Sequence, residues 1–301
     1  MRQICFGVDI GGTTVKLGLV SNDGELLEKR EFPSFRDVGS TFDAISANIK
    51  EILSTYDDEC AGAGVGVPGP VLEQRLVRGC VNLGWGDTDV AEELNRRCGL
   101  RVRVANDANL AALGEMWQGG GRGCRNLVLF TVGTGIGGGV ICDGRIISGA
   151  TGGGGELGHM PSPFHNDWDC TCGKRGCLEV TASARGIIRA AREFSPFRER
   201  ESLNAKDVFD AAADGDENAQ RVIQEAGYAL GYAAAVTACA VNPEVILIGG
   251  GVSAAGRALL DPVEAAFHAN VFPPCGNARF AQAELGNNAG IFGGAALFFC
   301  A

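Results

Sequence analysis

The sequence predicts an α/β protein, because three apolar strand-like stretches each run into a glycine-rich turn and helical patterns follow them. The first two stretches share one plan of strand, Gly-Thr turn and second strand, over 4–20 and 127–142. The third, VILIGGG at 245–251, is typical of a buried strand that enters a glycine turn. The repeated strand–turn–strand plan indicates two related halves.

Helical patterns fill the intervals between these strands. Thr41 is the expected N-cap of a helix over 41–56, whose apolar residues recur every three or four positions. Gly99 suits the C-cap of a helix over 88–99. Further helices are predicted over 105–117, 183–194 and 204–215, from Asp216, from Ala254 and over 287–299, the last packed on the first half. We therefore expect a small α/β domain from 1–118 plus 289–301, and a large α/β domain with a metal-binding loop from 119–288.

Composition excludes several classes of protein. The chain has 301 residues, 46 of them Gly, and a formal net charge of −10, so it lacks the basic face that nucleic-acid binding requires. The N-terminus does not resemble a signal peptide, and the apolar stretch 226–243 is rich in Ala and Gly, which favours a buried helix over a membrane span. Twelve cysteines without a signal peptide indicate a reducing compartment. We expect a cytoplasmic protein with no nucleic-acid or membrane partner.

The three glycine turns are candidate phosphate cradles, because clustered backbone N–H groups bind anions and Gly allows close approach. For any single turn, an ordinary hairpin turn remains an equal alternative. A Walker motif is absent, since the only nearby lysine is Lys16, and GTGIGG at 133–138 runs into a strand instead of the helix of a dinucleotide fold. Asp9, just before the first turn, is either a Mg²⁺-organising carboxylate or a structural turn cap.

An acid lies where a predicted strand ends and a helix begins, in VANDANLAALGE. Asn106, Asp107 and Asn109 are more side chains than one helix cap needs. We interpret Asp107 as a base that accepts a proton from a substrate hydroxyl in phosphoryl transfer. The alternative interpretation is that Asp107 only caps the helix.

Three cysteines and a histidine have the composition of a zinc site. His159, Cys170, Cys172 and Cys177 form a Cys₃His set, which is typical of a closed, structural Zn²⁺ site that does not activate water. A redox pair is disfavoured because no C-x-x-C occurs, and incidental thiols are the remaining alternative. His165 is a spare candidate ligand. The clamp would also hold two carboxylates, and an uncharged ligand with many hydroxyls would suit the set Asn82, Asn106, Asp107, Glu156 and Glu179.

The sequence resembles the ROK family (repressors, open reading frames and kinases) over essentially its whole length. The resemblance rests on motifs in the family's order: DIGGTTVKLGLV, VPGPV, VNLGW, NDANLAALGE, GTGIGGG, GELGHM, CTCGKRGCLE and IGGGVS. It implies a two-domain, actin-like (ribonuclease H-type) ATPase fold with ATP and a sugar in a central cleft. It also implies Mg²⁺, structural Zn²⁺ and a homodimer or higher homo-oligomer.

The resemblance assigns roles to individual residues. It implies that Asp107 is the catalytic base. It implies sugar contacts from Asn82, Asn106, Asp107, Glu156, His159 and Glu179, with His159 also a zinc ligand. It implies nucleotide binding by Asp9, Gly11, Gly12, Thr13, Thr14, Lys16, Gly133, Thr134, Gly135, Gly249, Gly250 and Gly251, of which 249–251 lie where the adenosine binds.

The family branch follows from finer features. VNLGW before an acidic helix looks most like the glucokinase branch, which implies transfer of phosphate from ATP to the 6-hydroxyl of glucose, in glycolysis. N-acetylmannosamine, N-acetylglucosamine, fructose and allose are the alternative substrates. GGGGE at 152–156 departs from the family, which more often has Ala before the Glu, and predicts a change in loop flexibility with broader sugar choice. A sugar-responsive repressor is disfavoured, because the phosphate hairpin starts within ten residues of Met1, and a non-catalytic sensor would not need Asp107.

Overall fold

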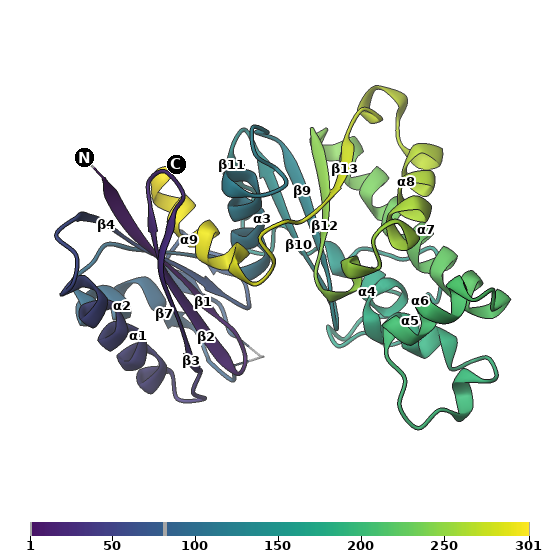
Figure 1. Ribbon diagram of the computed structural model, residues 1–301, viewed down its shortest axis with the longest axis horizontal. Coiled ribbons are helices and arrows are strands. Elements are labelled where there is room, and N and C mark those ends of the chain that lie inside the picture. Colours follow the sequence, from purple (N-terminus) through teal and green to yellow (C-terminus); the bar gives the residue numbers. More distant parts are fainter. Residues whose placement is uncertain (1, 81–82, 301) are drawn as a thin grey trace. The chain divides into compact units, whose positions relative to one another are not determined.

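The computed structural model describes residues 2–80 and 83–300, which form two compact units (Figure 1). Unit 1 consists of Met1–Arg125, Gly139–Gly155 and Leu285–Ala301, and unit 2 of Asn126–Gly138 and Glu156–Glu284. The predicted domains differ from these units chiefly in the segment Gly139–Gly155, which packs with the N-terminal part of the chain. The predicted domain boundaries stay a prediction.

Unit 1 is built on a five-stranded sheet in the order β3-β2-β1-β4-β8. Its strands are β1 Gln3–Ile10, β2 Thr14–Ser21, β3 Leu26–Pro33, β4 Glu59–Val67 and β8 Val102–Asn106. The hairpin predicted at the N-terminus is confirmed, since β1 and β2 pair antiparallel around the glycine turn. In contrast, β1, β4 and β8 pair parallel, so their carboxyl ends meet at one edge of the sheet. Three short strands, β5 Val71–Leu72, β6 Leu76–Val77 and β7 Thr88–Asp89, form a separate sheet.

Helices cover both faces of this sheet. The helices α1 Val38–Leu53 and α2 Val90–Cys98 pack on the face that carries Ile4, Phe6 and Val8. The helix α9 Ala289–Phe299 packs on the opposite face, beside Cys5, because successive strand residues point to opposite sides. The prediction for α1 is wrong at its start: Asp37 is the N-cap, and its carboxylate accepts from Ser40 N. Thr41 lies inside the helix, where its hydroxyl bonds to the backbone of Phe35 instead.

The C-terminal helix contacts the strand backbone directly at two glycines. A Cβ on Gly7 would overlap the carbonyl oxygen of Ile291, and a Cβ on Gly64 would overlap that of Gly294. Small residues therefore allow α9 to approach the strands at backbone distance. The predicted packing of the C-terminal helix against the first half is confirmed.

Unit 2 contains three neighbouring parallel strands in the order β9-β12-β13: Leu127–Val132, Val245–Gly249 and Arg279–Gln282. Strand β10 at Ile136–Cys142 follows β9 and pairs antiparallel with β11 at Arg145–Ile146, and the segment Gly139–Gly155 that carries most of this hairpin is assigned to unit 1. The prediction that a strand, and not a helix, follows the second glycine turn is confirmed. The other helices are α3 Asp107–Gln118 in unit 1 and, in unit 2, α4 Leu178–Ala182, α5 Ala184–Ala191, α6 Ala205–Ala213, α7 Glu217–Val241 and α8 Arg257–Asn270.

Two details of unit 2 refine the sequence predictions. The helix expected from Ala254 begins only at Arg257, because a 3₁₀ turn over Gly251–Ala255 precedes it. The long helix α7 is a core helix as predicted, and Gly231 lets it approach the backbone of Val263 in α8. No helix within the described residues is long and apolar enough to cross a membrane.

Candidate nucleotide, sugar and metal sites

The predicted base Asp107 and the candidate Mg²⁺ ligand Asp9 lie at the carboxyl edge of the unit 1 sheet. Asp9 in β1 is level with Gly66 in β4, and Gly66 is level with Ala105 in β8, two residues before Asp107. A Cβ on Gly66 would be 3.6 Å from the Cα of Asp107. Two strand spacings, about 9.6 Å, therefore separate the backbones that carry the two acids. The sheet brings a predicted Mg²⁺ ligand and the predicted base to one edge.

Asp9 is half-buried beside a lysine and the start of α9. Its carboxylate lies 3.9 Å from Lys16 Nζ, which donates a hydrogen bond of 3.3 Å to Asn287 Oδ1. Burial raises the pKa of Asp9, and the Lys16 ammonium opposes this rise. The adjacent turn is closed by a hydrogen bond from Gly11 N to Thr14 O, and the two threonine hydroxyls lie 3.5 Å apart. The predicted phosphate turn and Mg²⁺ carboxylate are thus neighbours in unit 1.

Asp9→Asn is expected to raise stability at pH 7 while it lowers kcat. Because the folded-state pKa exceeds the unfolded value, the ionised carboxylate costs stability above the folded pKa, and this cost disappears below the unfolded pKa. The stabilisation by Asn should therefore grow as pH rises through this window and then level off. If the metal contributes several kcal/mol to catalysis, kcat should fall about 10²-fold or more. Melting temperatures from pH 3.5 to 8 check the first part, and a stabilisation that is equal at all pH values would contradict it.

At the start of α3, the helix cap and the predicted base are different residues. Asn106 is the N-cap, and its Oδ1 accepts from Ala108 N at 3.0 Å and Asn109 N at 3.1 Å. Asp107 is the first helical residue, half-buried, and its Oδ1 accepts from Ala108 N at 2.8 Å. The helix therefore has its cap without Asp107. Of the other predicted sugar contacts, Asn82 lies outside the described residues.

Asn109 ties α3 to the glycine loop that precedes Glu156. Its side chain is buried, and Nδ2 donates to Gly154 O at 2.9 Å. In this loop Gly152 and Gly155 have φ of +80° and +90°, and a Cβ on Gly154 would overlap Ile147 O. Glycine at these three positions meets steric requirements of a packed loop. Asn106, Asp107 and Asn109 together are more side chains than a cap needs, and the partner of the Asn109 amide is visible only in the fold.

Gly155→Ala is expected to destabilise the protein by about 1–2 kcal/mol, because an L-residue at this positive φ brings Cβ against the backbone. Gly153→Ala is the matched control, since the nearest atom to its Cβ would be Thr151 Oγ1 at 3.8 Å. That change should be neutral or slightly stabilising. Urea denaturation of both variants measures the difference. Equal stability of the two variants would show that the loop tolerates Ala before Glu156.

In unit 2, two predicted nucleotide turns lie side by side. Gly133–Gly135 follows β9. Gly249 is the last residue of the parallel neighbour β12, level with Thr131, and Gly250 and Gly251 follow it. Gly250 has a φ of +83°, and a Cβ there would overlap Val132 O. Ligands of α/β sheets bind beyond the carboxyl ends of parallel strands. The two turns have this position.

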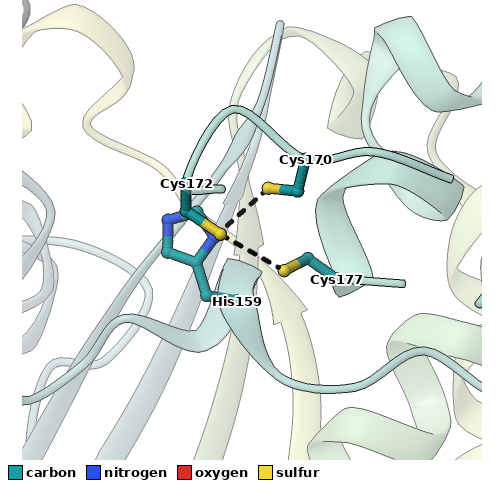
Figure 2. A group of neighbouring side chains, drawn as sticks. All are labelled: His159, Cys170, Cys172 and Cys177. Atoms are coloured by element: carbon teal, nitrogen blue, oxygen red, sulfur yellow. Dashed lines mark hydrogen bonds between the residues drawn. The ribbon is translucent and has the colours of Figure 1, made fainter. Parts of the chain in front are cut away.

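The four predicted zinc ligands converge in unit 2 (Figure 2). Their ligand atoms all lie within 4.8 Å of one another. Cys172 Sγ is 3.6 Å from Cys177 Sγ, and Cys170 Sγ is 3.7 Å from His159 Nδ1. Tetrahedral zinc, with bonds of about 2.3 Å to sulfur and 2.0 Å to nitrogen, separates two sulfurs by about 3.8 Å, and sulfur from nitrogen by about 3.5 Å. The donor set and its spacing fit Zn²⁺.

The surroundings of the cluster shift the pKa values of its thiols in different directions. Burial raises the pKa of Cys170 to about 12. Burial also acts to raise the pKa of Cys172, but the Lys174 N–H and the neighbouring thiols outweigh it and lower that pKa. His159 presents Nδ1 to the thiols, and its Nε2 lies 3.9 Å from the exposed carboxylate of Glu156. His165, the spare candidate, is outside the cluster and stacks on Trp168 at 3.8 Å between ring centroids.

Glu179, a predicted sugar contact, is buried between the metal loop and the Gly133–Gly135 turn. Its Oε1 accepts from Thr171 Oγ1 at 3.3 Å and from Cys170 Sγ at 3.0 Å, and its Oε2 lies 3.4 Å from Ile136 N. Unit 2 thus contains Glu156, His159, the three thiols, Glu179 and the two predicted nucleotide turns. Asn106, Asp107, Asp9 and the first turn belong to unit 1.

Arg185 was not predicted from the sequence. It donates from Nε to Thr134 O at 3.0 Å, and its position shortly after Glu179 was the only signal.

Known proteins resemble the chain over its full length. A glucokinase from Halalkalibacterium halodurans is 41% identical over 308 residues, which cover 96% of this chain and 92% of that protein. An N-acetyl-D-glucosamine kinase from Histophilus somni is 29% identical, across 97% of this chain and 98% of that protein. The crystal structure of a ROK family glucokinase from Streptomyces griseus in complex with glucose and AMPPNP has a TM-score of 0.77 and 30% identity, across 98% of this chain and 99% of that one.

These similarities confirm the predicted fold class, the α/β architecture of ROK kinases. The ROK family matches residues 5–300, and the chain belongs to it.

Proposed function

We propose that the protein is an ATP-dependent hexose kinase that transfers the γ-phosphoryl group to the 6-hydroxyl of glucose. The observation that carries this proposal is the position of Asp107, a carboxylate at the start of α3 whose helix cap is supplied by Asn106. It occurs in a chain that is 41% identical to a glucokinase across 96% of its length.

In the proposed mechanism, Asp107 accepts the proton of the attacking hydroxyl. The turns Gly11–Thr14 and Gly133–Gly135 hold the phosphates through backbone N–H groups, Lys16 adds positive charge, and Gly249–Gly251 borders the adenosine. Asp9 would hold Mg²⁺, which neutralises charge on the transferred phosphoryl group when it is bound. The position of Asp9 and Asp107 at the same sheet edge supports this division of roles.

The sugar contacts and the zinc belong to the same proposal. Asn82, Asn106, Glu156, His159 and Glu179 are the proposed partners of the sugar hydroxyls. His159, Cys170, Cys172 and Cys177 would hold a structural Zn²⁺ that fixes the segment carrying Glu156 and Glu179. We further propose that the protein is a cytoplasmic homodimer. The family resemblance supports the homodimer, and the twelve cysteines, which suit a reducing compartment, support the cytoplasm.

A panel of hexoses assayed with ATP and ranked by kcat/KM tests the substrate. Glucose should give the highest value. The similarity to an N-acetyl-D-glucosamine kinase makes N-acetylated hexosamines the main alternative. A wide margin in their favour would overturn the assignment to glucose, and the absence of sugar-dependent ATP consumption would overturn the kinase assignment.

A further inference from the structure

The turn Gly133–Ile136 is held from both arms of the metal cluster. On the first arm, Gly158 precedes the ligand His159, and a Cβ on Gly158 would overlap the carbonyl oxygen of Ile136. On the second arm, Glu179 follows the ligand Cys177 by two residues, and its Oε2 lies 3.4 Å from Ile136 N. Ile136 is therefore flanked by a residue next to one metal ligand and a residue close to another.

The segment after Cys177 supports the rest of the turn. Ala184 N donates to Gly133 O at 2.8 Å, and Arg185 Nε donates to Thr134 O at 3.0 Å. A Cβ on Gly135 would lie 2.6 Å from Glu179 Oε2, so the carboxylate is packed directly on the turn. The two arms are joined to each other, because Leu178 N donates to Met160 O at 2.7 Å.

We infer that the metal cluster and the Gly133–Ile136 turn form one structural unit. In this unit Glu179 positions the turn, and metal binding raises nucleotide affinity. The inference rests on the proposed function, since it takes this turn to bind phosphate. Glu179 suits the role because its two oxygens face opposite ways: Oε1 faces Thr171 in the metal loop, and Oε2 faces the turn. Neither of these two contacts requires the proton of Cys170, which metal binding would remove.

The coupling must be reciprocal, because a free-energy coupling between two binding sites acts equally in both directions. If the metal strengthens nucleotide binding, the nucleotide must strengthen metal binding by the same factor. Couplings of this kind are typically about 5- to 150-fold. A carboxylate that merely stabilises the fold would not make metal affinity depend on nucleotide.

The experiment measures AMPPNP binding calorimetrically, with Mg²⁺ and without sugar, together with zinc affinity, from the extent to which a chelator withdraws zinc at equilibrium. Wild-type protein should bind zinc at least about fivefold more tightly when AMPPNP is bound. Glu179→Gln, whose amide no longer offers two equivalent acceptor oxygens, should keep zinc but bind AMPPNP at least about fivefold more weakly. It should also lose the effect of nucleotide on zinc affinity.

Asp210→Asn in α6 is the matched control, because Asp210 is an exposed carboxylate whose Oδ2 accepts a hydrogen bond of 2.6 Å from Lys206 Nζ. It should keep wild-type AMPPNP affinity. The inference would be overturned if Glu179→Gln bound AMPPNP within twofold of the wild-type affinity. It would also be overturned if zinc binding by the wild type did not depend on AMPPNP. Wild-type protein that binds no nucleotide would overturn the proposed function and this inference together, whereas tight binding that is independent of zinc and of Glu179 would overturn the inference alone.

Discussion

Asp107→Asn should lower kcat by about 10²- to 10⁴-fold, the usual loss when a positioned general base is removed. The amide keeps the size of the side chain and its hydrogen bonding, but it cannot take the proton of the attacking hydroxyl. Sugar and ATP affinities should stay within a few fold, so the loss should appear in kcat. Steady-state kinetics with separate sugar and ATP titrations measure both quantities.

The structure sharpens the control for this experiment. Because Asn106 is the N-cap of α3, Asp107→Asn should leave the melting temperature nearly unchanged. Asp37→Asn is a matched control at a carboxylate that does cap a helix, where it accepts from Ser40 N at 2.7 Å. Asn caps as well as Asp, so this variant should keep both stability and kcat. A folded Asp107→Asn protein with near-normal kcat would remove Asp107 from the mechanism.

Cys172→Ser should lower both zinc content and sugar affinity. Loss of a direct ligand should weaken metal binding by more than the roughly 10- to 100-fold that the loss of an outer-sphere partner costs. Without the metal, the segment that carries Glu156 and Glu179 loses its anchor, and sugar binding should weaken about tenfold or more, the value of one hydrogen bond to a charged group. Metal analysis should find about one zinc per wild-type chain and clearly less in the variant.

Cys239→Ser controls for the loss of a thiol. Cys239 is an exposed cysteine on α7 and is not part of the cluster, so its replacement should change neither zinc content nor sugar affinity. Wild-type sugar binding by zinc-free Cys172→Ser protein would separate the metal from the sugar site. A wild-type protein that purifies without any zinc and cannot be loaded would refute the metal site itself.

The candidate metal cluster was predictable because its residues are close in sequence and chemically distinctive. Three thiols within eight residues, preceded by His159, have few other uses in a reducing compartment, and the spacing of their atoms in the fold suits zinc. The hairpin around Gly11–Thr14 was predictable for a similar reason, since strand patterns on both sides of a glycine turn are local signals. The N-cap of α1 was misplaced by four residues because both Asp37 and Thr41 are good caps, and the sequence does not show which side chain reaches a free N–H.

The sequence by itself determined the α/β class, the glycine turns, the cluster of His159 with three cysteines and the helix start at Asn106 and Asp107, because each depends on residues near one another in the chain. Only the tertiary structure decided the rest. The parallel register that brings Asp9 and Asp107 to one sheet edge joins strands almost 100 residues apart. The buried position of Glu179 depends on contacts with Ile136 and Thr171 together, and one-dimensional patterns do not encode such contacts. Packing therefore made a positioning residue of a carboxylate that the sequence presented only as a sugar contact.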